Sequence, residues 1–310
     1  MDKTQEKISI ITCTYNRANT LPTVYKSLCN QTYKNFEWIV VNDGSDDNTE
    51  ELVKSWINEN KLDILYLYEE NNGKHIATNL AISKANGYFE INLDSDDFLI
   101  DNALEIFIDA WNSIPKKDWK DYYAVKARCF DPKTNKPIGH PKENGRWEGH
   151  LLDAKYKYGF NFEMSAMSRI EVTRQYPNPD IRGGKKNGGL RFYPEGIAQD
   201  LASRKYKTLY IPDTVRGYVT DNSSSLMGRN NKYDRSRENY YLWTHIVNDN
   251  LDYFFYDIKS FLKAFTGVSM DAKFLKMSYK NMMKTIKGPM RKALVTLFIP
   301  LGHIAYLIKK

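Results

Sequence analysis

The sequence predicts an α/β fold with a mostly parallel sheet, and three observations in its first 110 residues support this class. Four apolar runs have the length and composition of buried strands, at 8–13, 36–43, 62–70 and 87–94. Segments with the apolar spacing of amphipathic helices lie between them, at 20–31, 48–60 and 75–87. Polar loops follow three of the four runs, with the sequences TYNRANT, NDGSDDNTE and DSDD.

The composition of each strand supports the prediction in chain order. ISIITC is an unbroken apolar run, and FEWIVVND, LDILYLYEE and GYFEINLD follow at intervals that leave room for a helix between each pair. Runs this apolar indicate parallel strands that helices cover on both faces. We therefore expect right-handed crossovers, and a site formed by the loops at the carboxyl ends of the strands.

The acidic residues after the second strand have two predicted roles. Asp46 and Asp47 come just before the second helix, where a carboxylate can cap the helix N-terminus, and we interpret both as capping residues. Asp43 differs because it comes directly after the apolar run WIVV and before Gly44. Its side chain should therefore point towards the site at the sheet edge.

Composition restricts the class of protein. A chain of 310 residues that is 42% hydrophobic can form one large domain, or one domain with an appendage. Its three cysteines have no metal-ligand spacing, which argues against a disulfide framework and a zinc cluster. The charged N-terminus passes directly into a strand pattern, so we expect no signal segment and a cytoplasmic location.

The net charge of +7 is concentrated at the C-terminal end. Residues 271–310 hold nine lysines and arginines and one acid, which leaves the rest of the chain close to neutral. A nucleic-acid-binding protein should instead spread its basic residues over a folded face. We therefore expect no nucleic-acid partner.

The basic segment also contains an apolar run at 293–308 with basic residues on both sides. These sixteen residues are fewer than the roughly 20 that span a bilayer. An amphipathic or re-entrant segment of this kind can lie in an anionic leaflet, and the alternative is a helix packed on its own domain. We expect a peripheral protein at the inner face of the cell membrane, attached through residues 271–310.

Three aspartates, Asp94, Asp96 and Asp97, crowd the end of the fourth strand. Like charges this close raise one another's pKa unless a positive group lies between them. A calcium loop does not fit, because Phe98 and Leu99 occupy the positions of a ligand and of the required glycine. The pattern Asp-x-Asp after a strand favours a divalent metal that is bound together with a phosphate.

These loops belong to two longer motifs, SIITCTYNRANTLPTVYKSLCNQTYKNFEWIVVNDGSDDNT and NNGKHIATNLAISKANGYFEINLDSDD. Over residues 7–110 they resemble the nucleotide-sugar-binding half of glycosyltransferase family 2. The family has the GT-A fold, a Rossmann-like sheet sandwiched by helices, and its members invert the anomeric carbon while transferring a sugar from a nucleotide-diphosphate donor. The resemblance implies that Asp96 holds Mn²⁺ or Mg²⁺, with Asp97 as a neighbouring group or a helix cap.

The same resemblance implies a set of contacts with the nucleotide sugar. The first loop would line the base pocket, the second strand would hold the base, and the remaining residues would lie near the uracil or the ribose. The implied residues are Thr14, Tyr15, Arg17, Asp43, Lys74 and Asp94.

An inverting transfer also needs a carboxylate that takes the proton of the acceptor hydroxyl. In the family this group commonly lies in a Glu-Asp pair that begins a helix. The segment RFYPEGIAQDLASRKYKTLYIPD has Glu195 followed by a glycine instead. Counting back from the end of the helix assigns Glu195 as the base and Asp200 as the fallback. The alternative is that Glu195 only complements a helix N-terminus after Pro194.

The chain should divide near residue 230. Residues 1–230 would form the GT-A catalytic domain, with a nucleotide-sugar half at 7–110 and an acceptor-binding half at 111–230. Residues 231–310 would form a helical extension.

The acceptor-binding half contains further candidates. Two polar loops, 178–189 and 217–232, could reach the donor diphosphate, and Arg229 is a candidate contact. Three aromatic residues could stack on a sugar ring, although packing in the core fits each of them better: Trp147, Tyr158 and Phe160.

We therefore expect an inverting, metal-dependent transferase. The donor sugar would be carried by UDP, as is common in the family. The acceptor would be a growing glycan or a polyprenyl-linked precursor of a surface polysaccharide, such as a capsule of the cell envelope. Two alternatives stay open. A nucleotidyltransferase would need a glycine-rich phosphate loop after the first strand, which TYNRANT does not supply. An inactive nucleotide- or sugar-binding module would keep the fold, and the missing aspartate of the Glu-Asp pair is compatible with it.

Overall fold

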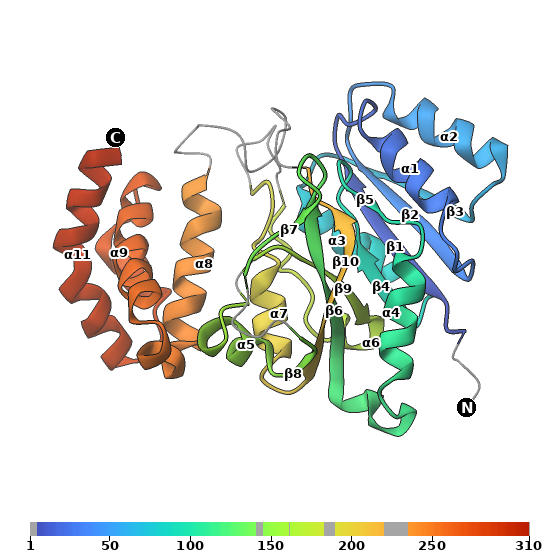
Figure 1. Ribbon diagram of the computed structural model, residues 1–310. Helices are drawn as coiled ribbons and strands as arrows, with labels where there is room; N and C mark the ends of the chain where they lie inside the picture. Colours follow the sequence, from blue (N-terminus) through green and yellow to red (C-terminus); the bar gives the residue numbers. More distant parts are fainter. Residues whose placement is uncertain (1–4, 141–144, 161, 183–189, 220–234, 310) are drawn as a thin grey trace. The chain divides into compact units, whose positions relative to one another are not determined.

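The computed structural model describes residues 5–140, 145–160, 162–182, 190–219 and 235–309 (Figure 1). The contacts within the chain divide it into two compact units. The first unit comprises Met1–Arg191 and Ala198–Ser225, and the second comprises Phe192–Ile197 and Leu226–Lys310. The expected division near residue 230 lies outside the described residues.

The first unit is built on one mixed sheet with the strand order β3-β2-β1-β4-β9-β6-β10-β5. The first four strands in chain order pair in parallel with one another. They are β1 (Ile8–Thr14), β2 (Phe36–Asp43), β3 (Ile64–Glu69) and β4 (Phe89–Asn92). The parallel sheet that the apolar runs predict is therefore confirmed.

The rest of the sheet is mainly antiparallel. β9 (Met164–Arg169) lies between β4 and β6 (Tyr122–Asp131) and is antiparallel to both. β6 then pairs in parallel with β10 (Lys207–Gly217). Three short strands pair at the edges of this part: β5 (Phe98–Leu99), β7 (Lys136–Pro137) and β8 (Trp147–Gly149).

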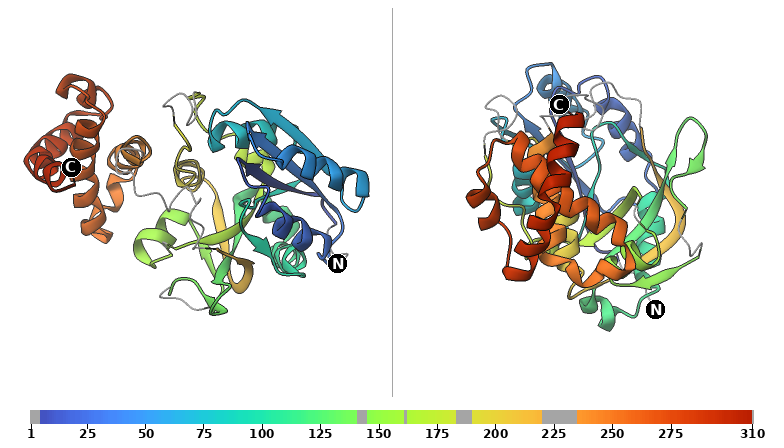
Figure 2. Two further views of the ribbon diagram at one scale, coloured as in Figure 1. Left: turned by 90° about the horizontal axis from the view of Figure 1, so that it is seen from above. Right: turned by 90° about the vertical axis from the view of Figure 1, so that its left-hand side faces the viewer.

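Helices cover both faces of the parallel strands (Figure 2). One face packs on α1 (Leu21–Cys29), α2 (Thr49–Glu59) and α4 (Ala103–Asn112). The other face packs on α3 (Lys74–Lys84) and α6 (Ile170–Thr173). Because successive strand residues point to opposite faces, a strand covered on both sides must be apolar throughout, which is the pattern of these runs.

Aromatic rings fix α1 and α2 on the sheet. Tyr25 of α1 stacks on Trp56 of α2 with ring centroids 4.4 Å apart, and both rings stack on Trp38 of β2. Trp38 is fully buried, and its Nε1 donates to the hydroxyl of Thr12 on β1 at 3.0 Å. This packing and the hydrogen bond to Thr12 hold α1, α2 and the first two strands together.

A second aromatic cluster lies where β8 meets β10, next to α5 (Leu151–Lys157). The ring of Trp147 is 5.1 Å from Tyr158 and 5.3 Å from Tyr210, and Phe160 is 4.7 Å from Tyr210. Tyr210 is 1% exposed. These contacts agree with the alternative that Trp147, Tyr158 and Phe160 are packing residues.

Residues 235–309 of the second unit are mainly helical, and the helical extension expected in the fold class is confirmed. Its α9 (Ile258–Phe274) packs between α8 (Ser236–Asp249) and α11 (Pro289–Lys309), as Figure 1 shows. The shorter α10 (Tyr279–Lys284) connects α9 to α11, and a 3₁₀ turn at Leu251–Tyr256 connects α8 to α9.

The last helix is longer than its apolar run. α11 has 21 residues and continues through Pro300. Among the described residues it is the one helix whose length and composition would allow it to cross a membrane, and 11% of the apolar window is buried. The sixteen-residue run therefore underestimates the helix, because the flanking basic residues are also helical.

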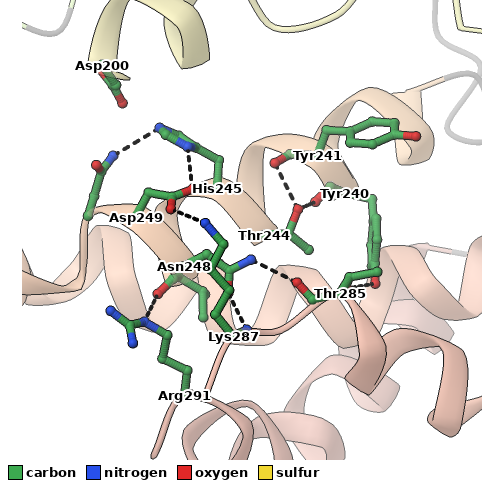
Figure 3. A network of polar contacts seen from close by, with 12 residues as sticks. Asp200, Tyr240, Tyr241, Thr244, His245, Asn248, Asp249, Thr285, Lys287 and Arg291 are labelled. Atoms are coloured by element: carbon green, nitrogen blue, oxygen red, sulfur yellow. Dashed lines mark hydrogen bonds and ion pairs between the residues drawn. The ribbon is translucent and has the colours of Figure 1, made fainter. Parts of the chain in front are cut away.

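A network of polar contacts joins α8 to the start of α11 (Figure 3). The carboxylate of Asp249 lies 3.1 Å from His245 Nδ1 and 2.6 Å from Lys287 Nζ. Asn248 accepts from the backbone amide of Lys287 at 2.8 Å, and Arg291 Nε donates to a backbone carbonyl of α8 at 3.1 Å. The network therefore fixes the beginning of α11 on the last turn of α8.

Asp249→Asn should destabilise the second unit by about 2 kcal/mol at neutral pH. Burial raises the pKa of Asp249, but the contacts with His245 and Lys287 outweigh it and lower the pKa from 3.8 to about 2. A carboxyl with a lowered folded-state pKa stabilises the fold above its unfolded-state pKa, and this stabilisation is lost as the pH falls towards 2.

Urea unfolding of both proteins measures this difference. The difference in the free energy of unfolding between wild type and variant should be largest at about pH 6 and should decrease below about pH 4. A gap that stays constant over this range would show that the charge of Asp249 does not stabilise the unit.

Candidate functional site

The candidate site lies where the order of the parallel strands reverses. β1 lies between β2 and β4 in the sheet. The chain adds β2 and β3 on one side of β1 and then crosses to add β4 on the other side. Ligands of open α/β sheets bind at such a point, at the carboxyl ends of the strands. The loop after β1 carries the half-buried Tyr15 and the buried Arg17, and the loop after β4 carries Asp94 and Asp96.

Asp94 forms an ion pair with Lys74, the first residue of α3. Lys74 Nζ lies 2.7 Å from Asp94 Oδ1. Burial alone would raise the pKa of Asp94, but the positive charges of Lys74, Arg216 and Arg17 outweigh it and lower the pKa below its ordinary value. Asp94 is therefore ionised at neutral pH, and two residues predicted for the nucleotide sugar lie together.

Asp96 meets the loop after β1. Arg17 Nη1 lies 3.5 Å from Asp96 Oδ2, and the two side chains are 9% and 16% exposed. The hydroxyl of Thr20 donates to the carbonyl of Ser95 at 2.8 Å, which adds a second connection between the loops. The TYNRANT and DSDD loops therefore form one contiguous surface.

Arg216 is a charged residue of this region that the sequence analysis missed. It comes from β10, is 4% exposed, and its Nε lies 3.4 Å from Asp97 Oδ2. It also pairs with Glu163. Nothing local in the sequence marks it, because its partners follow β4 and precede β9 and only the folded sheet brings these segments together.

Asp97 bonds to β10 and the segment that follows it. Its Oδ1 accepts from the amide of Val219 at 3.0 Å. Burial raises the pKa of Asp97 to about 7, against the opposing effect of Arg216. The alternative role as a cap of the next helix is wrong, because α4 begins at Ala103 after Asn102, and Asp97 bonds elsewhere.

Asp43 holds the turn that leads into α3. Its Oδ1 accepts from the amide of Asn72 at 2.8 Å, and its Oδ2 accepts from the amide of Gly73 at 3.1 Å and the side-chain amide of Asn71 at 3.2 Å. Gly73 has a φ of 99°, which favours glycine. Asp43 therefore fixes the position of Lys74, the next residue. A direct contact with a base stays a prediction.

Two buried oxygens at this edge have no hydrogen-bond partner among the described residues, Thr14 Oγ1 and Glu69 Oε1. Thr14 ends β1, and Glu69 ends β3 opposite Asp43 in the register. Burial raises the pKa of Glu69 to about 7, and the charge of Asp43 adds to the effect. The sequence analysis missed Glu69, because it ends a run that indicates a strand.

The loop after β2 caps α2 and supports the loop after β1. Asp47 Oδ1 accepts from the amide of Thr49, the first residue of α2, at 3.1 Å. Its Oδ2 accepts from the amide of Ala18 at 3.0 Å. The amide of Asp46 donates to Asn16 Oδ1 at 2.7 Å. Asp47 therefore binds the first amide of α2, as expected of a capping residue, although the N-cap position itself is Asn48.

The two candidates for the base lie at the start of α7 (Gly196–Ala202). Glu195 directly precedes this helix, and Asp200 lies in its second turn. Asp200 is 2% exposed and pairs with Lys155 of α5 at 3.1 Å. Its neighbour Gln199 accepts from Lys126 of β6 at 2.7 Å. Asp200 is therefore engaged by a cation inside the first unit, whereas Glu195 belongs to the second unit by its contacts.

The aspartates after β4 are the residues that could hold a metal. The side chains of Asp94 and Asp96 are 35% and 16% exposed, so a ligand can reach them. Within the described part of the chain, no group of three or more His, Cys, Asp and Glu could hold a metal ion. One or two carboxylates fit Mg²⁺ or Mn²⁺ when phosphate oxygens and water complete the coordination.

The two polar loops of the acceptor-binding half are only partly described. Residues 178–182 lie beside α3, where the carbonyl of Ile181 is 2.8 Å from His75 Nε2. The amide of Lys74 donates to the carbonyl of Arg191 at 2.8 Å, so the chain returns to the same helix. Residues 183–189, most of the second loop and Arg229 lie outside the described residues.

Asp43→Asn should remove a pH dependence of stability between about pH 4 and pH 6. Burial raises the pKa of Asp43 from 3.8 to about 6, so over this range the folded state holds a proton that the unfolded state has released. Wild type should therefore lose about 3 kcal/mol relative to the variant as the pH rises through this window. Urea unfolding at a series of pH values measures the change, and parallel curves for the two proteins would contradict it.

The sequence is similar to a known protein family and to several curated proteins. A family model described as Glycosyl transferase family 2 matches residues 9–172, just over half of the chain. An uncharacterized glycosyltransferase of Rickettsia bellii is 41% identical over 100 residues, which are 32% of this chain and 14% of that protein. The chondroitin synthase of Pasteurella multocida is 37% identical over 99 residues, which are 32% of this chain and 10% of that protein. The chain thus aligns with a minor part of each curated relative.

A solved structure is similar over nearly the whole chain. The crystal structure of S. aureus TarS 1-349 in complex with UDP-GlcNAc has a TM-score of 0.61 and 16% sequence identity. The match covers 97% of this chain and 92% of that chain. At this identity the similarity concerns the fold, and it agrees with the GT-A class expected from the sequence.

Proposed function

We propose that this chain, which belongs to glycosyl transferase family 2, transfers a sugar from a nucleotide-diphosphate donor to a hydroxyl of a growing glycan or a lipid-linked acceptor. One observation carries the proposal. The loop with Arg17, the start of α3 with Lys74, and the DSDD loop meet at the switch point of a parallel sheet. Cations and carboxylates arranged in this way suit a metal-bound diphosphate.

The donor would bind over the carboxyl ends of β1 and β2. Thr14, Tyr15 and Arg17 line the base pocket in this proposal, and Thr14 Oγ1 is buried without a hydrogen-bond partner among the described residues. Lys74 and Asp94 lie towards the ribose, positioned by the turn that Asp43 holds. UDP is the first nucleotide to test, because TarS was crystallised with UDP-GlcNAc and with UDP.

Asp96 would hold Mn²⁺ or Mg²⁺. The metal would supply positive charge to the diphosphate as it leaves the sugar. Arg17 lies beside Asp96 and Lys74 beside Asp94, so both cations can orient the same phosphates. This arrangement supports a leaving group that departs in a fixed direction.

Glu195 would act as the general base. It takes the proton of the acceptor hydroxyl while the hydroxyl oxygen attacks the anomeric carbon from the side opposite the diphosphate, which inverts that centre. Asp200 is the fallback, but a buried carboxylate paired with Lys155 is poorly placed to accept a proton from a substrate. Burial and pairing of Asp200 therefore support the choice of Glu195.

The acceptor and the location are proposed from the relatives and from the charge of the C-terminal segment. The chondroitin synthase among the relatives makes a polymer by its name, which is compatible with a polysaccharide acceptor such as a capsule chain. The basic segment 271–310 favours attachment at the inner face of the cell membrane, where a polyprenyl-linked acceptor would be available. An inactive binding module is the alternative, and only an activity measurement separates the two.

Titration calorimetry should show that one nucleoside diphosphate, expected to be UDP, binds more tightly with Mn²⁺ than without it. Asp96→Ala should abolish this metal dependence, because it removes the proposed ligand. The matched control is Asp101→Ala, which removes an exposed carboxylate five residues further along the chain and should leave the metal dependence intact. If UDP, GDP, CDP and dTDP all fail to bind with and without metal, the donor site is wrong.

Glu195→Gln should lower kcat by about 10²- to 10⁴-fold while the affinity for the nucleotide stays close to wild type. The isosteric amide keeps the shape of the side chain and removes its ability to accept a proton. Asp200→Asn serves as the comparison, and it should instead lower thermal stability, because Lys155 would lose its buried partner. If Asp200→Asn folds but has no activity, the general base would instead be Asp200.

A further inference from the structure

α11 carries a stripe of apolar side chains that the second unit leaves uncovered. Its five residues are 61%, 71%, 51%, 53% and 78% exposed, in the order Met290, Leu297, Leu301, Ile304 and Ile308. Steps of seven, four, three and four residues keep them on one side of a helix with 3.6 residues per turn. We call these residues the α11 stripe.

Another side of α11 is fixed on α9. Gly302 is buried so closely that an added Cβ would lie 2.8 Å from a backbone oxygen of α9. The ring of Phe298 is 5.4 Å from Phe265, and the ring of Tyr306 is 4.7 Å from Phe274. A helix that crossed a bilayer as a separate span would lose these contacts, whereas a helix lying on a surface keeps them.

The charged residues of the segment that contains the stripe are all basic. From residue 272 to the end the chain has no acidic residue. Lys276, Lys280 and Lys284 are exposed in the segment before α11, and Lys292 and Lys309 are exposed near its two ends. A second copy of the same surface would bring these like charges together, whereas an anionic lipid surface attracts them.

We propose that the α11 stripe lies in the plane of an anionic membrane leaflet while α11 stays packed on α9. The stripe enters the boundary between headgroups and acyl chains, and the basic side chains reach the lipid phosphates. This inference rests on the proposed membrane attachment and defines its surface and mode. The attachment is therefore in-plane, although α11 has the length and composition of a span.

Flotation of the full-length protein with vesicles tests the surface. Wild type should float with phosphatidylcholine vesicles that contain phosphatidylglycerol, and much less with phosphatidylcholine alone. Leu297→Glu should lower the partition coefficient at least about tenfold, because it removes an apolar contact and places a carboxylate in the leaflet. Thr296→Glu is the matched control, since it adds the same charge about 100° around the helix from Leu297.

The control variant should lose no more than about fivefold, which corresponds to one charge near the surface. Equal binding of wild type and Leu297→Glu, or no binding of wild type to anionic vesicles, would overturn the inference. Calorimetry with UDP on the same samples separates this failure from a failure of the donor site, because the residues proposed to bind the nucleotide belong to the first unit and α11 belongs to the second.

Two further measurements test the mode and the occupant. Carbonate extraction should release the vesicle-bound protein, as expected for an in-plane helix, and resistance to extraction would instead show a span. Sedimentation without lipid should give the same mass for wild type and Leu297→Glu. A wild-type oligomer that the substitution dissociates would show that the stripe binds a second copy, and it would overturn the membrane assignment.

Discussion

The site depends on how three neighbouring aspartates share positive charge. Asp94, Asp96 and Asp97 leave a buried strand together, and carboxylates this close raise one another's pKa unless cations lie between them. Their partners come from separate parts of the chain: the loop after β1, the start of α3 and strand β10 at Arg216. The charged loop can therefore form only when the parallel strands and β10 are in place, which couples the site to the completed fold.

The same charge balance suggests how a donor would enter. In the protein alone, Arg17 and Lys74 neutralise the carboxylates that a metal would bind. A metal by itself would have to displace these cations from the carboxylates. A diphosphate by itself would be repelled by the carboxylates, because both are negatively charged. With both present, Asp96 would hold the metal while Arg17 and Lys74 would turn to the phosphates, so every charge would keep a partner. Metal and donor should consequently bind more strongly together than either alone.

Local patterns predicted the parallel half of the fold well, because β1 to β4 are covered on both faces and must be apolar throughout. The contact of Asp47 with the start of α2 could also be predicted, because its partner Thr49 is only two residues away in the sequence. Arg216 and Glu69 were missed because strand pairing, which no local window contains, decides their neighbours. The length of α11 was underestimated for a related reason: contacts with α8 and α9 extend the helix into its polar ends.

The distribution of charge separates two tasks along the chain. The first 270 residues are close to neutral, so the nucleotide edge acts through individual ion pairs and not through the general field of the protein. The basic residues gather in the second unit, beside an apolar stripe that is too narrow to hold a membrane firmly alone. Neither the basic residues nor the apolar stripe is sufficient by itself, because stable membrane attachment generally needs two such signals. An enzyme attached in this way would remain near a lipid-linked acceptor only where anionic lipid is present, and it would leave the surface without unfolding.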